Sequence, residues 1–337
     1  MYFRSMNKND ISDLKNLLST PQKIVIIPHR NPDGDAMGSS LAMYHFLIKM
    51  NHDVQVIVPN EFPDFLAWMP GSEKVLVFEK DRATTTAIIE KSTLIFALDF
   101  NALHRVGELE KILETLTTPF VMIDHHQAPT DFAKYTFSDT TFGSTCEMVY
   151  HLIEDLGLKN VIDQDIATCI YTGILTDSGG FKYPKTTGTT HRIVADLIDL
   201  GVENTKIPSL LYENSTLARL QLMGRAFENM KVFADKKTAY TTLSQRELDH
   251  FHFTKGDTEG SVNYGLSIKG IIFAAIFIEN KQENIVKISF RSKGDFDVND
   301  FSRHHFEGGG HINAAGGKSS LSLTETVLKF EKLVQEL

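Results

Sequence analysis

Short apolar runs in the first 124 residues alternate with stretches of helical periodicity. They are rich in Val, Ile and Phe, as is typical of parallel strands that are buried on both faces. The runs are KIVIIPH (23–29), VQVIVP (54–59), VLVF (75–78), LIFALD (94–99) and FVMID (120–124). The segments between them include helical patterns at 36–50 and 106–116. Strands that alternate with helices predict an α/β fold with a doubly wound parallel sheet.

Three of these runs end directly in ionisable residues, namely His29, Asp99 and Asp124. The carboxyl ends of parallel strands meet at one edge of the sheet, and ligands of such sheets bind just beyond that edge. The sequence therefore predicts a polar site at this edge.

The predicted secondary structure of the chain changes twice after the fifth run. Helical patterns dominate first, and strand-like runs with polar turns return from about residue 231. The helical stretches are 143–157, 163–177, 189–201 and 216–230. A final helix is predicted after Ser322, which is a suitable N-cap with Glu325 three residues on. We expect a catalytic domain (1–188), a helical connector (189–230) and a smaller C-terminal α/β domain with a mixed sheet (231–337).

The composition limits the classes of partner. A net charge of −9 is a poor match for long duplex DNA, although a local basic pocket could hold a short anion. No stretch approaches the roughly 20 apolar residues of a membrane span, and the first residues have no apolar signal core. We therefore expect a cytoplasmic protein without a membrane partner. Cys146 and Cys169 lie in apolar helical patterns and are predicted to be buried thiols.

Acidic and histidine residues recur in five segments. The segments are HRNPDGDAMGS with His29, Asp33 and Asp35; Asp99; Asp124-His125-His126; Asp177; and GGGHINAAGG with His311. Each alone has an ordinary explanation as a turn, a cap or a surface residue. Together, several carboxylates at one sheet edge would repel each other unless cations lay among them. Carboxylate and imidazole donors favour Mn²⁺, with Mg²⁺ or Co²⁺ as alternatives, and the lack of a thiolate argues against structural zinc.

This order of motifs, HxxxDxD, Asp, DHH and Asp, resembles the DHH superfamily of phosphoesterases. The closing GGGHINAAGG, preceded by KISFRS and DVNDF, is similar to the DHH-associated C-terminal domain of the NrnA-type branch, which comprises nanoRNases and pAp phosphatases. The resemblance implies two divalent metal ions. It places one on His29, Asp33 and Asp99, and the other on Asp35, Asp99, His125 and Asp177. It also implies catalytic roles for Asp99, for His126 beside the scissile phosphate, and for Asp124, which would orient the histidines.

The C-terminal domain is expected to bind substrate. A turn at Gly308, Gly309 and Gly310 that leads into a helix would offer N–H groups to an anion. Arg291 and His311 are candidate phosphate ligands, and Arg105 is a weaker candidate.

The leading hypothesis is hydrolysis of short RNA oligomers to mononucleotides and of pAp to AMP. Alternatives are a phosphodiesterase for linear or cyclic dinucleotides (pApA, c-di-AMP) and an exopolyphosphatase- or pyrophosphatase-like hydrolase. The alternative from another functional class is a nucleotide-binding sensor that does not hydrolyse its ligand. The expected partners are short RNA oligonucleotides or small nucleotides, and a homodimer is left open.

Overall fold

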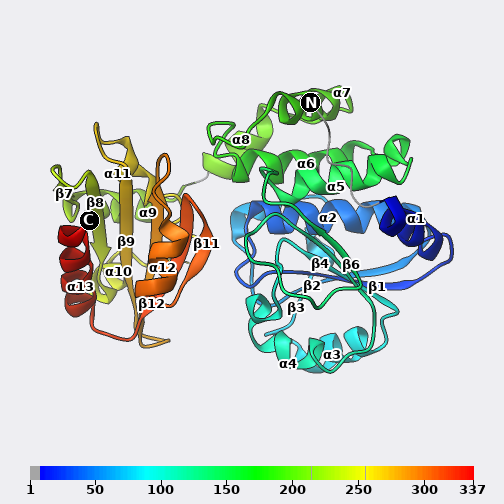
Figure 1. The fold of residues 1–337 in the computed structure, drawn as a ribbon, viewed down its shortest axis with the longest axis horizontal. Coiled ribbons are helices and arrows are strands. Elements are labelled where there is room, and N and C mark those ends of the chain that lie inside the picture. The colour runs from blue at the N-terminus through cyan, green and yellow to red at the C-terminus, as the bar shows by residue number, and fades with distance from the viewer. Residues whose placement is uncertain (1–7, 214, 255) are drawn as a thin grey trace. The chain divides into compact units, whose positions relative to one another are not determined.

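The computed structural model describes residues 8–213, 215–254 and 256–337. The chain divides between residues 214 and 215 into two compact units (Figure 1). Each unit has hydrophobic clusters of its own. Those of the first unit involve residues 11–211 and those of the second unit residues 222–334. Each unit therefore contains the apolar packing expected of a folded domain.

The first unit is built on a six-stranded sheet in the order β3-β2-β1-β4-β5-β6, in which every pairing is parallel. Its strands are β1 (Lys23–Pro28), β2 (Asp53–Val58), β3 (Leu76–Val77), β4 (Leu94–Leu98), β5 (Phe120–Asp124) and β6 (Tyr135–Ser138). The doubly wound sheet is confirmed. The sequence analysis missed β6, because its four residues YTFS alternate in burial and lack a continuous apolar run.

Helices cover both faces of this sheet (Figure 1). Alternate strand residues such as Ile24 and Ile26 face one cluster, and Val25 and Ile27 face the other. The first cluster is covered by α1 (Lys8–Leu17), α2 (Gly34–Lys49), α5 (Thr145–Asp155), α6 (Gln164–Asp177), α7 (Gly188–Asp199) and α8 (Lys206–Tyr212). The second cluster is covered by α3 (Arg82–Glu90), the 3₁₀ helix η3 (Leu103–Leu109) and α4 (Glu110–Leu113).

One predicted helix of this unit is wrong in its extent. The segment 106–116 was expected to form a single helix, but it consists of the end of η3 and the four-residue α4. Gly107 interrupts it with φ 63° and ψ −131°, a conformation outside the helical region. Three further short 3₁₀ helices are η1 (Asp64–Leu66), η2 (Ser72–Lys74) and η4 (Lys159–Val161).

The second unit holds a mixed six-stranded sheet in the order β11-β12-β10-β9-β8-β7, as predicted for the C-terminal part. Among the described strands of this sheet, β8 and β9 pair in parallel and the other neighbours pair antiparallel. Its strands are β7 (Lys231–Phe233), β8 (Thr238–Leu243), β9 (Phe273–Asn280), β10 (Ile285–Ser292), β11 (Gly309–His311) and β12 (Ala314–Ser319). Its helices are α9 (Leu217–Glu228), α10 (Gln245–His250), α11 (Asn263–Ser267), α12 (Val298–His305) and α13 (Leu323–Glu336).

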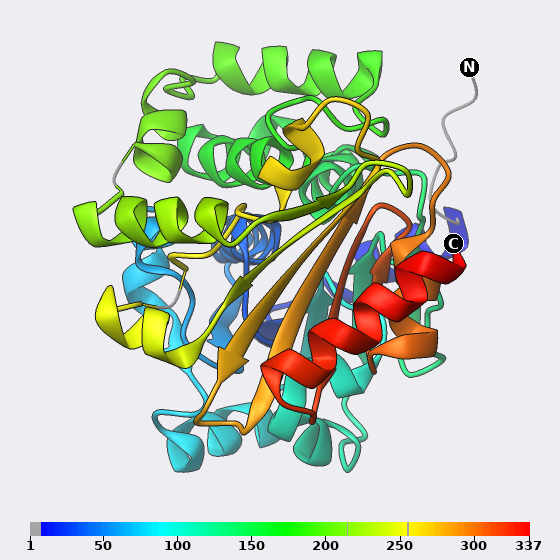
Figure 2. The ribbon, with the colours of Figure 1, turned by 90° about the vertical axis from the view of Figure 1, so that its left-hand side faces the viewer.

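The closing helix α13 begins at the predicted cap. The Ser322 side chain accepts from the Glu325 N–H, and the Glu325 carboxylate accepts from the Ser322 N–H. Figure 2 shows α13 (red) lying against the sheet of its unit. It packs there through Phe330 and Val334, which are both buried.

The glycine run before His311 does not lead into a helix, and this expectation was wrong. It forms β11, which pairs with β12 in a hairpin with Gly309 opposite Gly316. The strands approach so closely that a Cβ on Gly308 would lie 1.9 Å from the carbonyl oxygen of Gly316. Gly310 also has φ +151°, which L-residues rarely adopt. The glycines thus serve close backbone packing.

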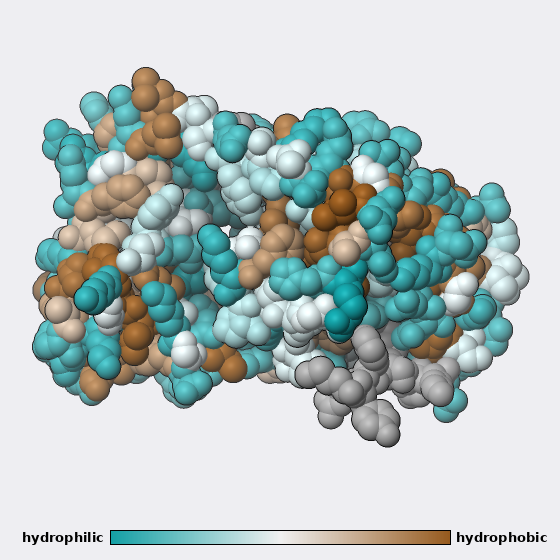
Figure 3. Space-filling view, turned by 90° about the horizontal axis from the view of Figure 1, so that it is seen from above, coloured by the Kyte–Doolittle hydropathy of each residue, from teal (hydrophilic) through white to brown (hydrophobic). Residues whose placement is uncertain are grey.

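The stretch expected as a connector, 189–230, is helical throughout most of its length. Its helices α7 and α8 belong to the first unit and α9 to the second. Among the described residues, no helix is long and apolar enough to cross a membrane. Figure 3 shows hydrophilic residues interspersed with smaller hydrophobic groups on the visible face.

Candidate metal centre

The loop after β1 carries the first three predicted ligands and is held in shape by asparagines. Asn31 has φ 57°, in the left-handed region that asparagine tolerates better than most residues. The side chain of Asn60 accepts from the Asn31 N–H at 2.7 Å and donates to its Oδ1 at 2.9 Å. Asp33 then caps α2 by accepting from the N–H groups of Asp35 and Ala36. This path brings His29, Asp33 and Asp35 to the carboxyl edge of the sheet.

Asp99 follows β4 and has a strained backbone. Its φ of 65° is unusual for a residue with a side chain. Its N–H donates to the carbonyl of Ile123 on the neighbouring strand at 3.0 Å. Two residues later, the buried Asn101 donates to the carbonyls of His126 and Gln127 at 2.9 and 3.1 Å. The loops after β4 and β5 are therefore fixed to each other.

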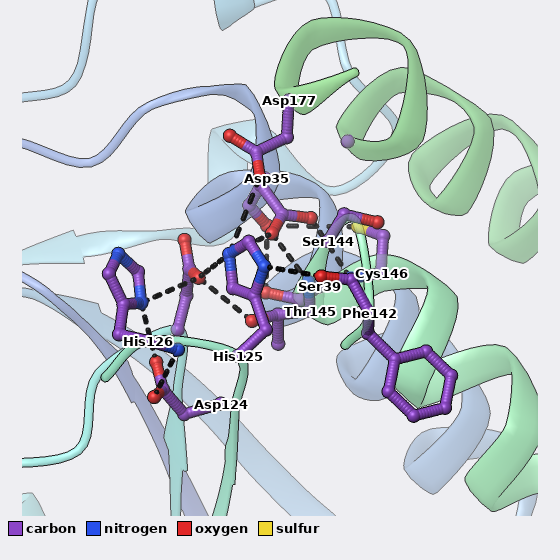
Figure 4. A network of polar contacts seen from close by, with 12 residues as sticks. Asp35, Ser39, Asp124, His125, His126, Phe142, Ser144, Thr145, Cys146 and Asp177 are labelled. Carbon is purple, nitrogen blue, oxygen red and sulfur yellow. Dashed lines mark hydrogen bonds and ion pairs between the residues drawn. The ribbon is translucent and has the colours of Figure 1, made fainter. Parts of the chain in front are cut away.

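His125 points its Nε2 at three carboxylates. The distances are 3.3 Å to Asp177 Oδ2, 3.5 Å to Asp99 Oδ1 and 3.8 Å to Asp35 Oδ2. On the other side of the ring, Nδ1 lies 3.3 Å from the carbonyl oxygen of Phe142 (Figure 4). A proton on Nδ1 would satisfy that carbonyl and leave Nε2 as the ligand atom, as is usual for histidines that bind metals.

His29 repeats this arrangement on the other side of Asp99. Its Nδ1 lies 2.9 Å from the carbonyl oxygen of Arg30. Its Nε2 lies 3.4 Å from Asp99 Oδ2 and 3.8 Å from Asp33 Oδ2. The two oxygens of Asp99 therefore face two different imidazoles, each with a further carboxylate beside it.

These groups fit two divalent ions. The ligand atoms of His29, Asp33 and Asp99 lie within 4.8 Å of one another, as do those of Asp35, His125 and Asp177. Octahedral ligands at about 2.1 Å from a cation lie about 3 Å apart, so small inward movements would close either set around an ion. The donors are oxygens and imidazole nitrogens, which suit Mn²⁺ or Mg²⁺ better than thiolate-preferring ions.

Burial and mutual repulsion mark the carboxylates as groups that need a positive partner. Burial and the charges of Asp99 and Asp177 raise the pKa of Asp35 well above its ordinary value. Burial, opposed by the imidazole of His125, raises the pKa of Asp177 to about 7. Burial alone would lower the pKa of His125, but its hydrogen bond with Asp99 and the surrounding carboxylates raise it to about 10. Without a metal ion, the His125 proton supplies the missing positive charge.

The carboxyl group of Asp99 is held in its ionised form. Burial would raise its pKa, but hydrogen bonds from His125 and His29 hold that pKa well below the usual range. Burial alone would lower the pKa of His29, but its hydrogen bond with Asp99 and the charges of Asp33 and Asp99 together raise it.

Asp124 and His126 form a pair at the end of β5, next to Asp99, whose Oδ1 lies 3.8 Å from His126 Nδ1. Asp124 is fully buried, and its Oδ1 lies 2.7 Å from His126 Nδ1. Its Oδ2 accepts from the His126 N–H at 2.8 Å (Figure 4). Burial lowers the pKa of His126 despite this contact, which favours the neutral ring. Asp124 thereby fixes both the backbone and the ring of His126. His125 bonds to Phe142 instead.

The predicted substrate residues lie in both units. Arg105 is part of η3, its carbonyl accepts from the Arg30 N–H at 2.8 Å, and its charge acts to lower the pKa of His29. In the second unit, Arg291 and His311 both lie opposite Ala314, on strands to either side of β12. Cross-strand partners share a face of a sheet, so these two residues flank one small side chain.

The glycines next to His311 are less available to an anion than predicted. The Gly310 N–H donates to Asn299 Oδ1 at 2.8 Å, and Gly309 pairs with Gly316. Asn299 also accepts from Arg303 Nε at 3.1 Å, which brings that guanidinium close to Gly309.

The sequence analysis missed several residues that shape the site. Thr145, at the start of α5, contacts both Asp35 and Asp99. Lys185 is half-buried near the centre; burial lowers its pKa, whereas nearby carboxylates, foremost Asp177, act in the opposite direction. Nothing in the sequence pattern distinguishes these residues or Asn60, because each reaches the site only through the tertiary fold. Asn101 had one signal, its position two residues after Asp99.

Comparisons with known proteins agree with this geometry. Residues 23–174 match the DHH family, N-terminal domain, and residues 235–337 match the DHHA1 domain. An exopolyphosphatase-related protein from Bacteroides fragilis has 39% sequence identity and a TM-score of 0.94, over 99% of this chain and 98% of that chain. A bifunctional oligoribonuclease and PAP phosphatase NrnA from Thermus thermophilus is 28% identical over 299 residues, which are 87% of this chain and 83% of that protein.

A more distant structure shares the fold. RecJ from Thermus thermophilus, solved in complex with Mn²⁺, has 12% identity and a TM-score of 0.55, over 98% of this chain and 55% of that chain. The matches and the site together define a phosphoesterase, a hydrolase whose carboxylates and imidazoles are suited to divalent cations. The chain belongs to the DHH superfamily and is of the NrnA type, with a DHH domain followed by a DHHA1 domain.

Proposed function

We propose that the chain is a two-metal phosphoesterase that hydrolyses short RNA oligomers to mononucleotides and pAp to AMP. We also propose that Mn²⁺ is the working ion and that the protein acts in the cytoplasm, on short RNA or small nucleotides. Long duplex DNA and membranes are not among its proposed partners, and a homodimer is one form it could take.

One observation carries the two-ion assignment. The oxygens of Asp99 are turned toward different imidazoles, 3.4 Å from His29 and 3.5 Å from His125. A carboxylate placed in this way can bridge two cations, and each cation would have further donors of its own. When bound, such ions activate water and offset charge on the phosphoryl oxygens.

The protein residues have distinct roles in this proposal. Asp33 and His29 hold one ion, whereas Asp35, His125 and Asp177 hold the other. His126 is oriented by Asp124 and its pKa is lowered by burial, so that it can hold or pass a proton beside the scissile phosphate. Arg105 and Lys185 place positive charge near the centre, where the substrate phosphate would lie.

The substrate class rests on the relatives and on the second unit. The Thermus thermophilus relative is named for both oligoribonuclease and PAP phosphatase activity. Arg291 and His311 share one face beside Ala314, which suits a phosphate or a nucleotide rather than a large apolar ligand. The net charge of −9 disfavours long nucleic acid.

A substrate panel tests the proposal. The protein is incubated with Mn²⁺ and pAp, RNA of two to five nucleotides, pApA, c-di-AMP or pyrophosphate, and the products are separated by chromatography. Turnover of pAp and short RNA without turnover of pyrophosphate is the expected result. If nucleotides bind but no member of the panel is hydrolysed, the protein is a sensor and the proposal is wrong.

One relative favours a second candidate substrate. The Bacteroides fragilis protein is described as exopolyphosphatase-related and is 39% identical over nearly the whole chain. Linear polyphosphate therefore belongs in the panel. Release of orthophosphate from polyphosphate at a higher kcat/KM than from pAp would favour this activity over the leading one.

A further inference from the structure

Thr145 contacts two of the proposed metal ligands at once. Its Oγ1 donates to Asp99 Oδ1 at 2.8 Å, and its N–H donates to Asp35 Oδ2 at 2.6 Å. The residue is fully buried at the first position of α5 (Figure 4). It therefore connects a carboxylate from the loop after β4 with one from α2, although these are far apart in the sequence.

The N-terminus of α5 holds Asp35 through main-chain groups. Asp35 Oδ1 accepts from the Cys146 N–H at 2.9 Å, while Oδ2 accepts from Thr145. Each carboxylate oxygen has two lone-pair positions, so one position on each oxygen remains for a cation. These bonds involve only the backbone and would persist if the Thr145 side chain were changed.

The Thr145 hydroxyl acts on only one end of Asp99. It donates to Oδ1, the oxygen that faces His125. The other oxygen, Oδ2, faces His29 and does not accept from Thr145. The hydroxyl therefore restrains Asp99 Oδ1, the oxygen that faces His125, and leaves its second lone pair for a cation.

We propose that Thr145 is a positioning residue for one of the two ions, the ion held by Asp35, His125 and Asp177. Its hydroxyl orients Asp99 Oδ1 toward that ion and has little effect on the ion held by His29 and Asp33. This inference rests on the two-ion site of the proposed function. Thr145 lies outside the HxxxDxD, Asp, DHH and Asp motifs. The inference also predicts that the two ions depend differently on its hydroxyl.

A purely structural role makes a different prediction. A buried hydroxyl must have a partner, and Asp99 Oδ1 would satisfy it whether or not metals bind. Loss of the hydroxyl would then lower stability and would affect both ions alike or neither. The affinities of the two Mn²⁺ equivalents therefore separate positioning from simple burial.

The test is Mn²⁺ titration of metal-free protein by calorimetry and by electron paramagnetic resonance, which need no substrate. In Thr145→Val we expect one of the two Mn²⁺ equivalents to weaken by about 10–100-fold. The other equivalent should stay within about threefold of its original affinity. The spin-coupled signal of a Mn²⁺ pair should give way to a mononuclear signal at low occupancy. In Thr145→Ser, which keeps the hydroxyl, both Mn²⁺ equivalents should bind as they do in the unaltered protein.

Two comparisons make the result specific. Thr172→Val is the matched control, because Thr172 is also fully buried and bonds through Oγ1 to the Thr168 carbonyl within α6 rather than to a proposed ligand. It should leave both equivalents unchanged. In an Asp177→Asn background, which lacks a ligand of the affected ion, Thr145→Val should have little further effect on the remaining Mn²⁺. Thr145→Ala replaces valine if the valine variant does not fold.

Equal weakening of both equivalents, or of neither, would overturn the role of Thr145. So would a single Mn²⁺ equivalent in the unaltered protein. The proposed substrate class is tested separately. A protein that binds two ions with the expected asymmetry, yet hydrolyses nothing in the panel, would refute the proposed function and leave this inference intact.

Discussion

At the scale of single residues, Asp99 carries the largest share of the proposed chemistry. It has a backbone φ of 65°, is almost fully buried, and faces imidazoles with both oxygens. A strained residue persists only where its surroundings hold it in place. Here the Asp99 N–H is bonded to Ile123 on the adjacent strand. The backbone strain therefore coincides with the position that is proposed to bridge two ions.

We predict that Asp99→Asn lowers Mn²⁺ affinity and turnover by more than 100-fold, beyond the 10–100-fold typical of outer ligand partners. An amide has half the acceptor capacity of a carboxylate and carries no negative charge. Calorimetric Mn²⁺ titration and kcat/KM on pAp measure the two effects. Near-normal turnover with Mn²⁺ would show that Asp99 does not bridge.

Asp124 should act through His126 rather than through the metals. Its carboxylate contacts both the ring Nδ1 and the main-chain N–H of His126 at 2.7 and 2.8 Å. Asp124→Asn should lower kcat by about 10–100-fold, because an amide no longer imposes one ring tautomer. Mn²⁺ affinity should change by less than about threefold. If Mn²⁺ affinity falls as much as kcat does, Asp124 supports the metal site instead.

Mn²⁺ binding should strengthen as pH rises from 6 to 8. The ion must displace the proton of His125, whose pKa is about 10, and that of Asp177, whose pKa is about 7. Both groups bind the metal in their deprotonated forms, so protons compete with Mn²⁺. Binding should release at least one proton at pH 8 and more at pH 6. Calorimetry in buffers of different ionisation enthalpy counts these protons. A pH-independent affinity would contradict the proposed ligands.

At the scale of elements, the contact between α2 and α6 positions the carboxylates of Asp35 and Asp177. This contact depends on small residues. A Cβ on Gly173 would lie 2.2 Å from Cys146 Sγ and 2.7 Å from Asp35 Oδ1. A Cβ on Gly38 would lie 2.6 Å from the Cys169 carbonyl oxygen. Close approach of these helices is therefore a condition for the site.

We predict that Gly173→Ala destabilises the protein by about 1–3 kcal/mol, the usual cost of overpacking, and weakens Mn²⁺ binding. Gly224→Ala is the matched control in α9, where a new Cβ meets nothing within 4 Å. It should be neutral or stabilise by about 0.5–1 kcal/mol. Chemical unfolding and Mn²⁺ titration of both variants provide the test. Equal stability and equal Mn²⁺ affinity of the two variants would show that the close contact at Gly173 is unimportant.

Sequence patterns predicted the elements that have strong local signals. The long apolar strands and the residues at their ends were found because burial on both faces leaves a continuous hydrophobic run. The Ser322 cap was found because its partner lies three residues away. The strand β11 was mistaken for a turn before a helix, because its glycines pack against β12, a contact without any local signal.

The candidate site likewise contains residues with a local sequence signal and residues without one. Its acidic and histidine residues follow strands or end a helix, so they could be named from order along the chain. Thr145 and Asn60 could not, because their partners are distant in sequence. Thr145 bonds to Asp35 and Asp99, while Asn60 bonds to Asn31. Such contacts depend on how the loops fold over the sheet edge, which periodicity does not specify.

At the scale of the whole molecule, the division of hydrophobic cores decides where the chain can be cut. The main core of the first unit extends through α7 and α8 to Leu211. Six of its buried residues lie beyond the expected domain boundary at 188, namely Ile193, Val194, Leu197, Val202, Ile207 and Leu211. Each contributes about 1.5–3 kcal/mol when buried. A fragment that ends at 188 would lose this packing, whereas one that ends at 213 keeps it.

We predict that a fragment of residues 1–213 folds and binds Mn²⁺ with an affinity within about threefold of the full chain, because every proposed ligand and its supporting core are present. Its kcat/KM on pAp should fall by at least about 100-fold, since Arg291 and His311 are absent and each charged phosphate contact contributes roughly 1.5–3 kcal/mol. A fragment of residues 1–188 should unfold at lower denaturant concentration. Full activity of the 1–213 fragment on pAp would show that the second unit does not bind the substrate. Loss of Mn²⁺ binding by that fragment would mean that the metal centre depends on the second unit.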